Sequence, residues 1–135
     1  MTAAPTAIAV PIVDYLVLGE RPHLVASACT SCAATYFDRR NACASCGRAD
    51  FTTREVPTAG EVVSFTIVHF AAPGVPVPFV AAVIDCEGVR VRANLVNVAP
   101  DPEHVTLGMQ VRLSTYSLGR DTSGAEGIGF GFEPV

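Results

Sequence analysis

Five stretches in the second half of the chain carry the hydrophobic pattern of β-strands. Residues 60–70 and 89–97 alternate apolar and polar side chains, which is typical of strands with one buried face. Residues 79–86 form a short, mostly apolar run, and the turn signal Glu87-Gly88 separates it from the stretch that follows. The last two stretches are 109–118 and 128–133.

This order of strands predicts a small antiparallel barrel over residues 58–135. A break at 100–108 separates the third stretch from the fourth, and a polar connection at 119–127 separates the fourth from the fifth. Five short strands with one long connection are typical of the OB-fold, a five-stranded Greek-key barrel, and an SH3-like barrel is the alternative. We therefore expect a mainly β protein.

The segment Pro11–Glu20 has a different pattern, because it is apolar on nearly every side and bounded by proline and glycine. This favours a short amphipathic helix opened by Pro11 and closed near Gly19. Such a helix either packs on the barrel or docks on a partner through Ile12, Tyr15 and Leu16. Residues 1–22 are accordingly interpreted as a tail and short helix, 23–57 as a separate small unit, and 58–135 as the barrel.

Composition makes a protein partner more attractive. Of the 135 residues, 50% are hydrophobic and only 16% are charged. The longest stretch without a charged residue, 62–84, is interrupted by prolines and a glycine, so we expect no membrane span. No basic residue precedes Arg21, so we expect no secretory signal, a cytoplasmic location and reduced thiols. The apolar excess then predicts a covered surface.

Charge argues against general nucleic-acid binding. The chain has 9 basic and 13 acidic residues, with a formal net charge of -4, and every basic residue is arginine. Residues 1–57 are neutral overall, so 58–135 carry all of the net acidity. Phosphate neutralisation needs basic residues, and an acidic barrel is poorly suited to it. A single-stranded nucleic-acid module nevertheless stays as the alternative, because zinc ribbons and OB barrels occur in such proteins.

Four of the five cysteines form a Cys-x2-Cys-x10-Cys-x2-Cys pattern. Two-residue spacing brings two thiolates to one ion, and two such knuckles complete a tetrahedron, so Cys29, Cys32, Cys43 and Cys46 predict one structural zinc. Iron, two disulfides and a redox pair are weaker alternatives. Gly47 suits the turn after the second knuckle, whereas Ala33 holds that position in the first and is strained if the turn requires a positive φ.

No catalytic constellation is visible in the sequence. The fifth cysteine, Cys86, sits between Asp85 and Glu87, which should raise its pKa and make it a poor nucleophile. The three histidines are scattered, and His69 fits a buried or rim position on a strand. Arg39 and Arg40 follow Tyr36 and Phe37 between the knuckles, which is either a solvated surface or a patch for a phosphorylated ligand or a partner.

The ordered set of these segments resembles a known family. The stretches HLVASACTSCAATYFDRRNACASCG, GEVVSFTIVHF, PFVAAVIDCEGVRVRANLV, LGMQVRL and FGFEP are similar to bacterial and archaeal zinc-ribbon/OB-fold proteins associated with acyl-CoA enzymes, long catalogued as domain of unknown function 35. Ala33 departs from the glycine usual in that family, and Asp38 from its usual proline.

The resemblance implies a rubredoxin-like zinc ribbon, an OB-fold barrel and a non-catalytic accessory role. Relatives commonly pair with thiolase-superfamily enzymes, including thiolases, 3-hydroxy-3-methylglutaryl-CoA synthase and lipid-transfer-type aldolases of steroid side-chain degradation. Related domains are also fused to acyl-CoA hydratases of the hot-dog class. We therefore expect a hetero-oligomer with a thiolase-like catalytic subunit acting on a bulky acyl-CoA, with Phe37, Arg39, Arg40 and His69 as candidate contacts to acyl-CoA or the partner. An independent small enzyme using Cys86 or His69 is a further alternative.

Overall fold

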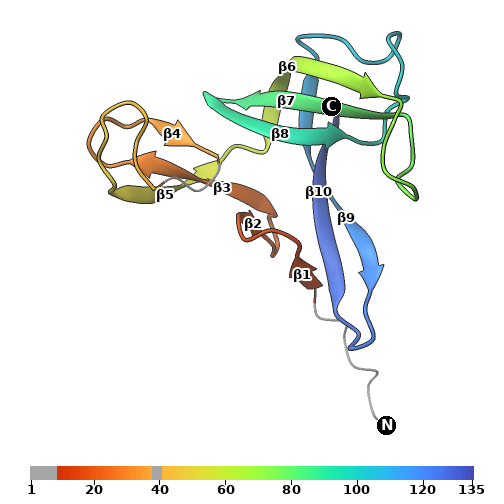
Figure 1. Cartoon of the computed structure of the whole chain (residues 1–135), viewed down its shortest axis with the longest axis horizontal. Helices are drawn as coiled ribbons and strands as arrows, with labels where there is room; N and C mark the ends of the chain where they lie inside the picture. Colours follow the sequence, from red (N-terminus) through yellow and green to blue (C-terminus); the bar gives the residue numbers. More distant parts are fainter. Residues whose placement is uncertain (1–8, 38–40) are drawn as a thin grey trace.

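The computed structural model describes residues 9–37 and 41–135, and throughout them the regular structure is β (Figure 1). Ten strands form two sheets. The first sheet contains β2 (Leu16–Val17), β3 (His23–Cys29), β4 (Thr35–Tyr36) and β5 (Phe51–Val56). The second contains β1 (Ala9–Pro11), β6 (Ala59–Val68), β7 (Phe79–Cys86), β8 (Val89–Leu95), β9 (Gln110–Arg120) and β10 (Glu126–Pro134).

The second sheet closes into the expected five-stranded barrel. Strands β6, β7 and β8 pair antiparallel in turn, β8 meets β10 in a parallel bridge, and β9 pairs with both β10 and β6. A bulge between Val62 and Ser64 changes which side chains of β6 face inward, so Val62 is buried before it and Phe65 and Ile67 pack on the core after it. The prediction of an OB-type barrel is confirmed.

The hairpin of β9 and β10 extends well beyond the barrel. Only the first residues of β9 pair with β6, through Ala59, Gly60 and Glu61, whereas its pairing with β10 continues to Arg120. In Figure 1 this part projects away from the barrel with β1 alongside β10. We call β1 together with residues 114–131 of β9 and β10 the arm. The polar connection expected at 119–127 is therefore largely taken up by the ends of these strands.

The prediction of a helix over Pro11–Glu20 is wrong. This segment contains the end of β1, a turn and β2. Its backbone groups bond to other strands: Ile12 N donates to Ile128 O at 2.9 Å, and Val25 N donates to Tyr15 O at 2.9 Å. Three of its residues are valine or isoleucine, whose branched side chains suit strands better than helices. Tertiary pairing has therefore overridden the helical boundary signals. Throughout the described residues, no helix is long and apolar enough to cross a membrane.

One cluster of buried apolar side chains joins the ribbon to the barrel. Leu16, Leu24 and Val56 come from the first sheet, and they share this cluster with Val62, Val91, Val111, Phe132 and other barrel residues. Above it lies an aromatic contact among three segments: Tyr15 meets Phe37 with ring centroids 4.5 Å apart and Phe130 at 5.9 Å. The ribbon is thus held against the barrel by shared packing.

Candidate metal centre and the adjoining cleft

Two knuckles with the same backbone hydrogen bonds hold the four predicted metal ligands. In the first, Ala33 N donates to Cys29 O at 3.0 Å and Cys29 N donates to Ala34 O at 2.8 Å. In the second, Gly47 N donates to Cys43 O at 2.8 Å and Cys43 N donates to Arg48 O at 2.7 Å. The equivalent positions Ala33 and Gly47 both have positive φ, 64° and 79°. The prediction of strain at Ala33 is confirmed, because alanine rarely adopts this conformation.

The four sulfur atoms lie at the separations that a tetrahedral zinc site requires. All four fall within 4.8 Å of one another. Cys29 Sγ lies 3.6 Å from Cys46 Sγ, and Cys32 Sγ lies 3.5 Å from Cys43 Sγ. A tetrahedron with Zn–S bonds of about 2.3 Å has sulfur atoms about 3.8 Å apart. Cys29 and Cys43 are buried, whereas Cys32 and Cys46 are exposed, so the site is close to the surface.

Hydrogen bonds and burial shift the pKa values of these thiols, in different directions. The Tyr36 hydroxyl, 3.4 Å from Cys43 Sγ, is the main cause that lowers the pKa of Cys43 to about 6. Backbone N–H groups of Cys32 and Ser31 lower the pKa of Cys29. The Arg48 backbone N–H lowers the pKa of Cys46, but burial and hydrogen bonds with the neighbouring thiols outweigh it and raise this pKa to about 12.

Four thiolates this close together repel one another, so a bound cation that neutralises them favours their ionised forms. A zinc ion held by Cys29, Cys32, Cys43 and Cys46 supplies that charge, and four thiolates leave it no open position for a substrate. The donor set therefore fits one structural zinc ion, which would cross-link the two knuckles.

The fifth cysteine and the histidines lie apart from this centre. Cys86 is fully buried in the barrel, and burial, with smaller contributions from Asp85 and Glu87, raises its pKa to about 11. The predicted direction is confirmed, although burial outweighs the two acids. His69 follows β6 on the surface, and His23 lies 3.7 Å from Glu55. None of these pairs a nucleophile with a base.

A three-residue cluster of possible ligands is explained by turn geometry. Asp101, Glu103 and His104 have their ligand atoms within 4.8 Å of one another, and all three lie toward the surface. The Asp101 carboxylate accepts hydrogen bonds from the backbone N–H groups of Glu103 and His104, each at 3.0 Å, and it lies 2.6 Å from His104 Nδ1. This is the pattern of a side chain that caps a turn.

A cleft lies between the ribbon and the barrel. Two of the expected contact residues, Tyr15 and Phe37, line it. Its volume is about 590 Å³. The ribbon side contributes three aromatic residues, Tyr15, Tyr36 and Phe37, and the barrel side contributes two arginines from β8, Arg90 and Arg92. In the sequence these arginines lie on the polar face of the alternating stretch 89–97, and no role was predicted for them. The signal that could have singled them out is two like charges two residues apart.

The residues predicted to contact acyl-CoA or the partner do not lie together. Phe37 lines the cleft, and His69 does not. Arg39 and Arg40 lie outside the described residues, as does Asp38. Of the three residues suggested for docking, Ile12 is 56% exposed, Tyr15 lines the cleft, and Leu16 lies in the chain's own core at 2% exposed.

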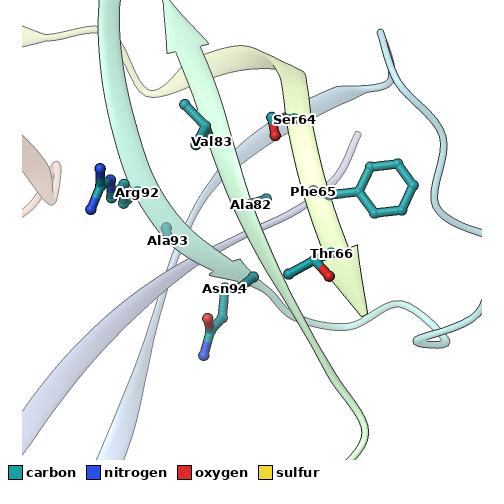
Figure 2. A pocket seen from close by; sticks show the side chains of 9 residues that line it. Ser64, Phe65, Thr66, Ala82, Val83, Arg92, Ala93 and Asn94 are labelled. Atoms are coloured by element: carbon teal, nitrogen blue, oxygen red, sulfur yellow. The ribbon is translucent and has the colours of Figure 1, made fainter. Parts of the chain in front are cut away.

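A shallower hollow of about 400 Å³ adjoins the cleft on the outer face of β6, β7 and β8. Figure 2 shows Ser64 and Thr66 on β6, Val83 on β7, and Arg92 and Asn94 on β8. Phe65 of β6 also lines the hollow, and its side chain packs on the core. Val83 and Arg92 line both the hollow and the cleft, which makes the two continuous.

A rubredoxin-like zinc ribbon followed by a closed OB-type barrel defines the class of this protein. Two family models match it in the same order: the rubredoxin-like zinc ribbon domain of ChsH2 over residues 18–52 and the C-terminal OB-fold domain of ChsH2 over residues 53–115. The chain belongs to the ChsH2 family of zinc-ribbon/OB-fold proteins, also called the DUF35 family.

A solved structure at 30% identity supports this assignment, and one further structure and one curated relative are also similar to the chain. A structure described as an Ltp2-ChsH2(DUF35) aldolase covers 83% of this chain and 84% of its own, with a TM-score of 0.64 and 30% identity. A DUF35 family protein of unknown function from Sulfolobus solfataricus covers 78% of this chain at 17% identity, with a TM-score of 0.48. A probable enoyl-CoA hydratase alpha subunit from Thermomonospora curvata is 34% identical over 96 residues, and the chain spans 30% of its length.

Proposed function

We propose that this chain is a non-catalytic, zinc-binding accessory subunit of an acyl-CoA enzyme complex. The observation that carries the proposal is the likeness to the Ltp2-ChsH2 aldolase over most of both chains. The curated relative described as an enoyl-CoA hydratase subunit supports the acyl-CoA class of substrate. We further propose that the catalytic partner is a thiolase-superfamily protein of the lipid-transfer type, acting as an aldolase or thiolase on a bulky acyl-CoA such as a steroid derivative.

The chemistry of the chain is consistent with an accessory role. Four thiolates saturate the zinc ion, and the described residues offer no nucleophile paired with a base. A general base must lie within hydrogen-bond reach of the proton that it abstracts, and neither Cys86 in the core nor His69 on the surface meets that requirement here. In our proposal, the catalytic residues belong to the partner.

The arm supplies the surface through which we propose that the partner binds. By their register, Val10, Tyr116 and Leu118 lie on one face of the arm, over the glycines 127 and 129, and Ile12 directly follows β1. These four side chains are 38–56% exposed. On the opposite face, Phe130 packs against Tyr15 and Phe37. One face is thus occupied within the chain, and the other is apolar and not covered by any residue that the structure describes, which favours association with a protein.

Co-expression with a candidate partner, a thiolase-superfamily protein of the lipid-transfer type, tests the proposal. We expect the two proteins to co-purify through a tag on either one, and we expect Leu118→Asp to abolish that co-purification because it puts a charge into an apolar contact. The matched control is Leu107→Asp, since Leu107 is 67% exposed but precedes β9 at the other end of that strand. Retention of the partner by Leu118→Asp, or loss in both variants, would contradict docking through the arm.

A further inference from the structure

Two arginines of the barrel form no ion pair with any residue that the structure describes. Residues 58–135 contain four arginines. Arg112 lies 3.4 Å from Glu133, and Arg120 lies 3.4 Å from Glu126. Arg90 and Arg92 form no ion pair with any carboxylate in the part of the chain that the structure describes. In a barrel whose net charge is negative, a pair of arginines without counter-charges is a local exception that needs an explanation.

The position of these arginines keeps them available to a ligand. They alternate along β8 with Val89 and Val91, which are buried, so both point to the outer face of the barrel. Two residues along a strand place their Cα atoms about 7 Å apart, so both guanidinium groups can reach one multiply charged anion. Asp85 stands opposite Arg90 in the register, but its carboxylate accepts the Gly88 N–H at 2.7 Å and closes the turn.

The surroundings of the arginines match the remainder of a nucleotide-bearing ligand. On one side lies the aromatic wall of Tyr15, Tyr36 and Phe37, and such rings take up the flat face of a base. On the other side, small side chains, among them Ala81 and Val83, form the floor of the hollow, which ends in the hydroxyls of Ser64 and Thr66. Among the residues that the structure describes, no acidic side chain lines either part. The groove therefore runs from aromatic through cationic to weakly polar.

We infer that this groove binds the nucleotide end of coenzyme A, with Arg90 and Arg92 holding its phosphates. Guanidinium groups form charge-assisted, often bidentate hydrogen bonds with phosphate oxygens. The inference rests on the proposed function for the identity of the ligand, and it adds the site. Phosphate binding is thereby assigned to the outer face of β8 and not to the segment between the knuckles. The ribbon forms one side of the groove.

Binding to the full-length, zinc-loaded chain tests this site without the partner. Coenzyme A, adenosine 3′,5′-bisphosphate, inorganic phosphate and a 15-nucleotide oligo(dT) are titrated separately by calorimetry at low salt. We expect coenzyme A to bind most tightly and the bisphosphate next, with inorganic phosphate far weaker. Arg90→Gln and Arg92→Gln should each weaken coenzyme A about 10-fold or more, because each removes a charge-assisted bond. Arg112→Gln, which removes an arginine elsewhere on the barrel, should change the affinity less than about 2-fold.

Three results would overturn the inference: no binding of coenzyme A, equal weakening by Arg112→Gln, or binding of oligo(dT) tighter than that of coenzyme A. The last result would favour a nucleic-acid site instead. Failure here is separable from failure of the proposed function, since co-purification of the partner does not depend on Arg90 or Arg92. Thermal denaturation of each variant, expected to match that of the parent protein, distinguishes a lost contact from a lost fold.

Discussion

At the residue scale, the metal centre could be predicted because the spacing of the cysteines determines which of them can bind one ion. Cysteine pairs separated by two residues can form only a narrow set of structures around one ion, and all four ligands follow from the sequence. Tyr36 was not assigned as a partner of Cys43, since that contact depends on how β4 folds back over the second knuckle. Arg90 and Arg92 were likewise visible only as a polar face, because the wall opposite them is built from distant residues.

Ala33 provides the residue-scale prediction. Its φ of 64° is the conformation that glycine adopts at the equivalent Gly47, so we expect Ala33→Gly to raise the free energy of unfolding. Relief of the left-handed strain exceeds the added flexibility of the unfolded chain by about 0.5–1 kcal/mol. Thermal denaturation at a fixed zinc concentration measures the change.

The matched control is Ala34→Gly, one position further along. Ala34 is not among the residues with positive φ, so glycine there brings only added flexibility and should destabilise by about 0.5–1 kcal/mol. If Ala33→Gly also destabilised the protein, the strain assigned to the first knuckle would be wrong.

At the element scale, strands with one buried face were predicted well and the short N-terminal segment was not. The apolar run 79–86 and the alternation along 89–97 correspond closely to β7 and β8, and one face of each strand packs on the core. Pro11–Glu20 lacks alternation, so its state is decided by what it can pair with. Strand β10 and strand β3 offer it backbone partners that the local sequence does not reveal.

Gly60 gives the element-scale prediction, because a side chain at this position of β6 would collide with β7. A Cβ atom at this position would lie 2.6 Å from Ile84 Cγ2, 2.8 Å from Asp85 O and 2.9 Å from Cys86 Sγ. Since one of these neighbours is backbone and all belong to the closed barrel, Gly60→Ala should destabilise by about 1–3 kcal/mol. Urea denaturation followed by circular dichroism measures the loss.

A glycine of the arm serves as the comparison. At Gly127 an added Cβ would meet only Leu118 Cβ, at 3.8 Å, which is ordinary contact. Gly127→Ala should therefore stay within about 1 kcal/mol of the parent protein. Equal losses at the two glycines would show that the barrel tolerates the closer contact and that its packing is looser than described.

At the scale of the whole molecule, the ribbon and the barrel share one core, and the arm extends beyond the barrel. Their shared core and the contact of Tyr15, Phe37 and Phe130 hold the two together. The sequence predicted the barrel, the ribbon and an apolar surplus, but it assigned that surplus to a helix. The structure shows that Leu16 belongs to the core and that one group of exposed apolar side chains lies on or beside the arm, while others, Phe70 among them, lie elsewhere on the surface.

The central claim is that this chain completes an enzyme whose chemistry belongs to another protein. It is tested most directly by measuring acyl-CoA cleavage with the thiolase-like partner alone, with the zinc-loaded chain alone, and with the two together. The account predicts that the chain alone is inactive, that the partner alone is insoluble or has less than about a tenth of the activity, and that the co-purified pair is active. Turnover by the chain alone would contradict the account, as would a soluble, fully active partner that forms no complex with it.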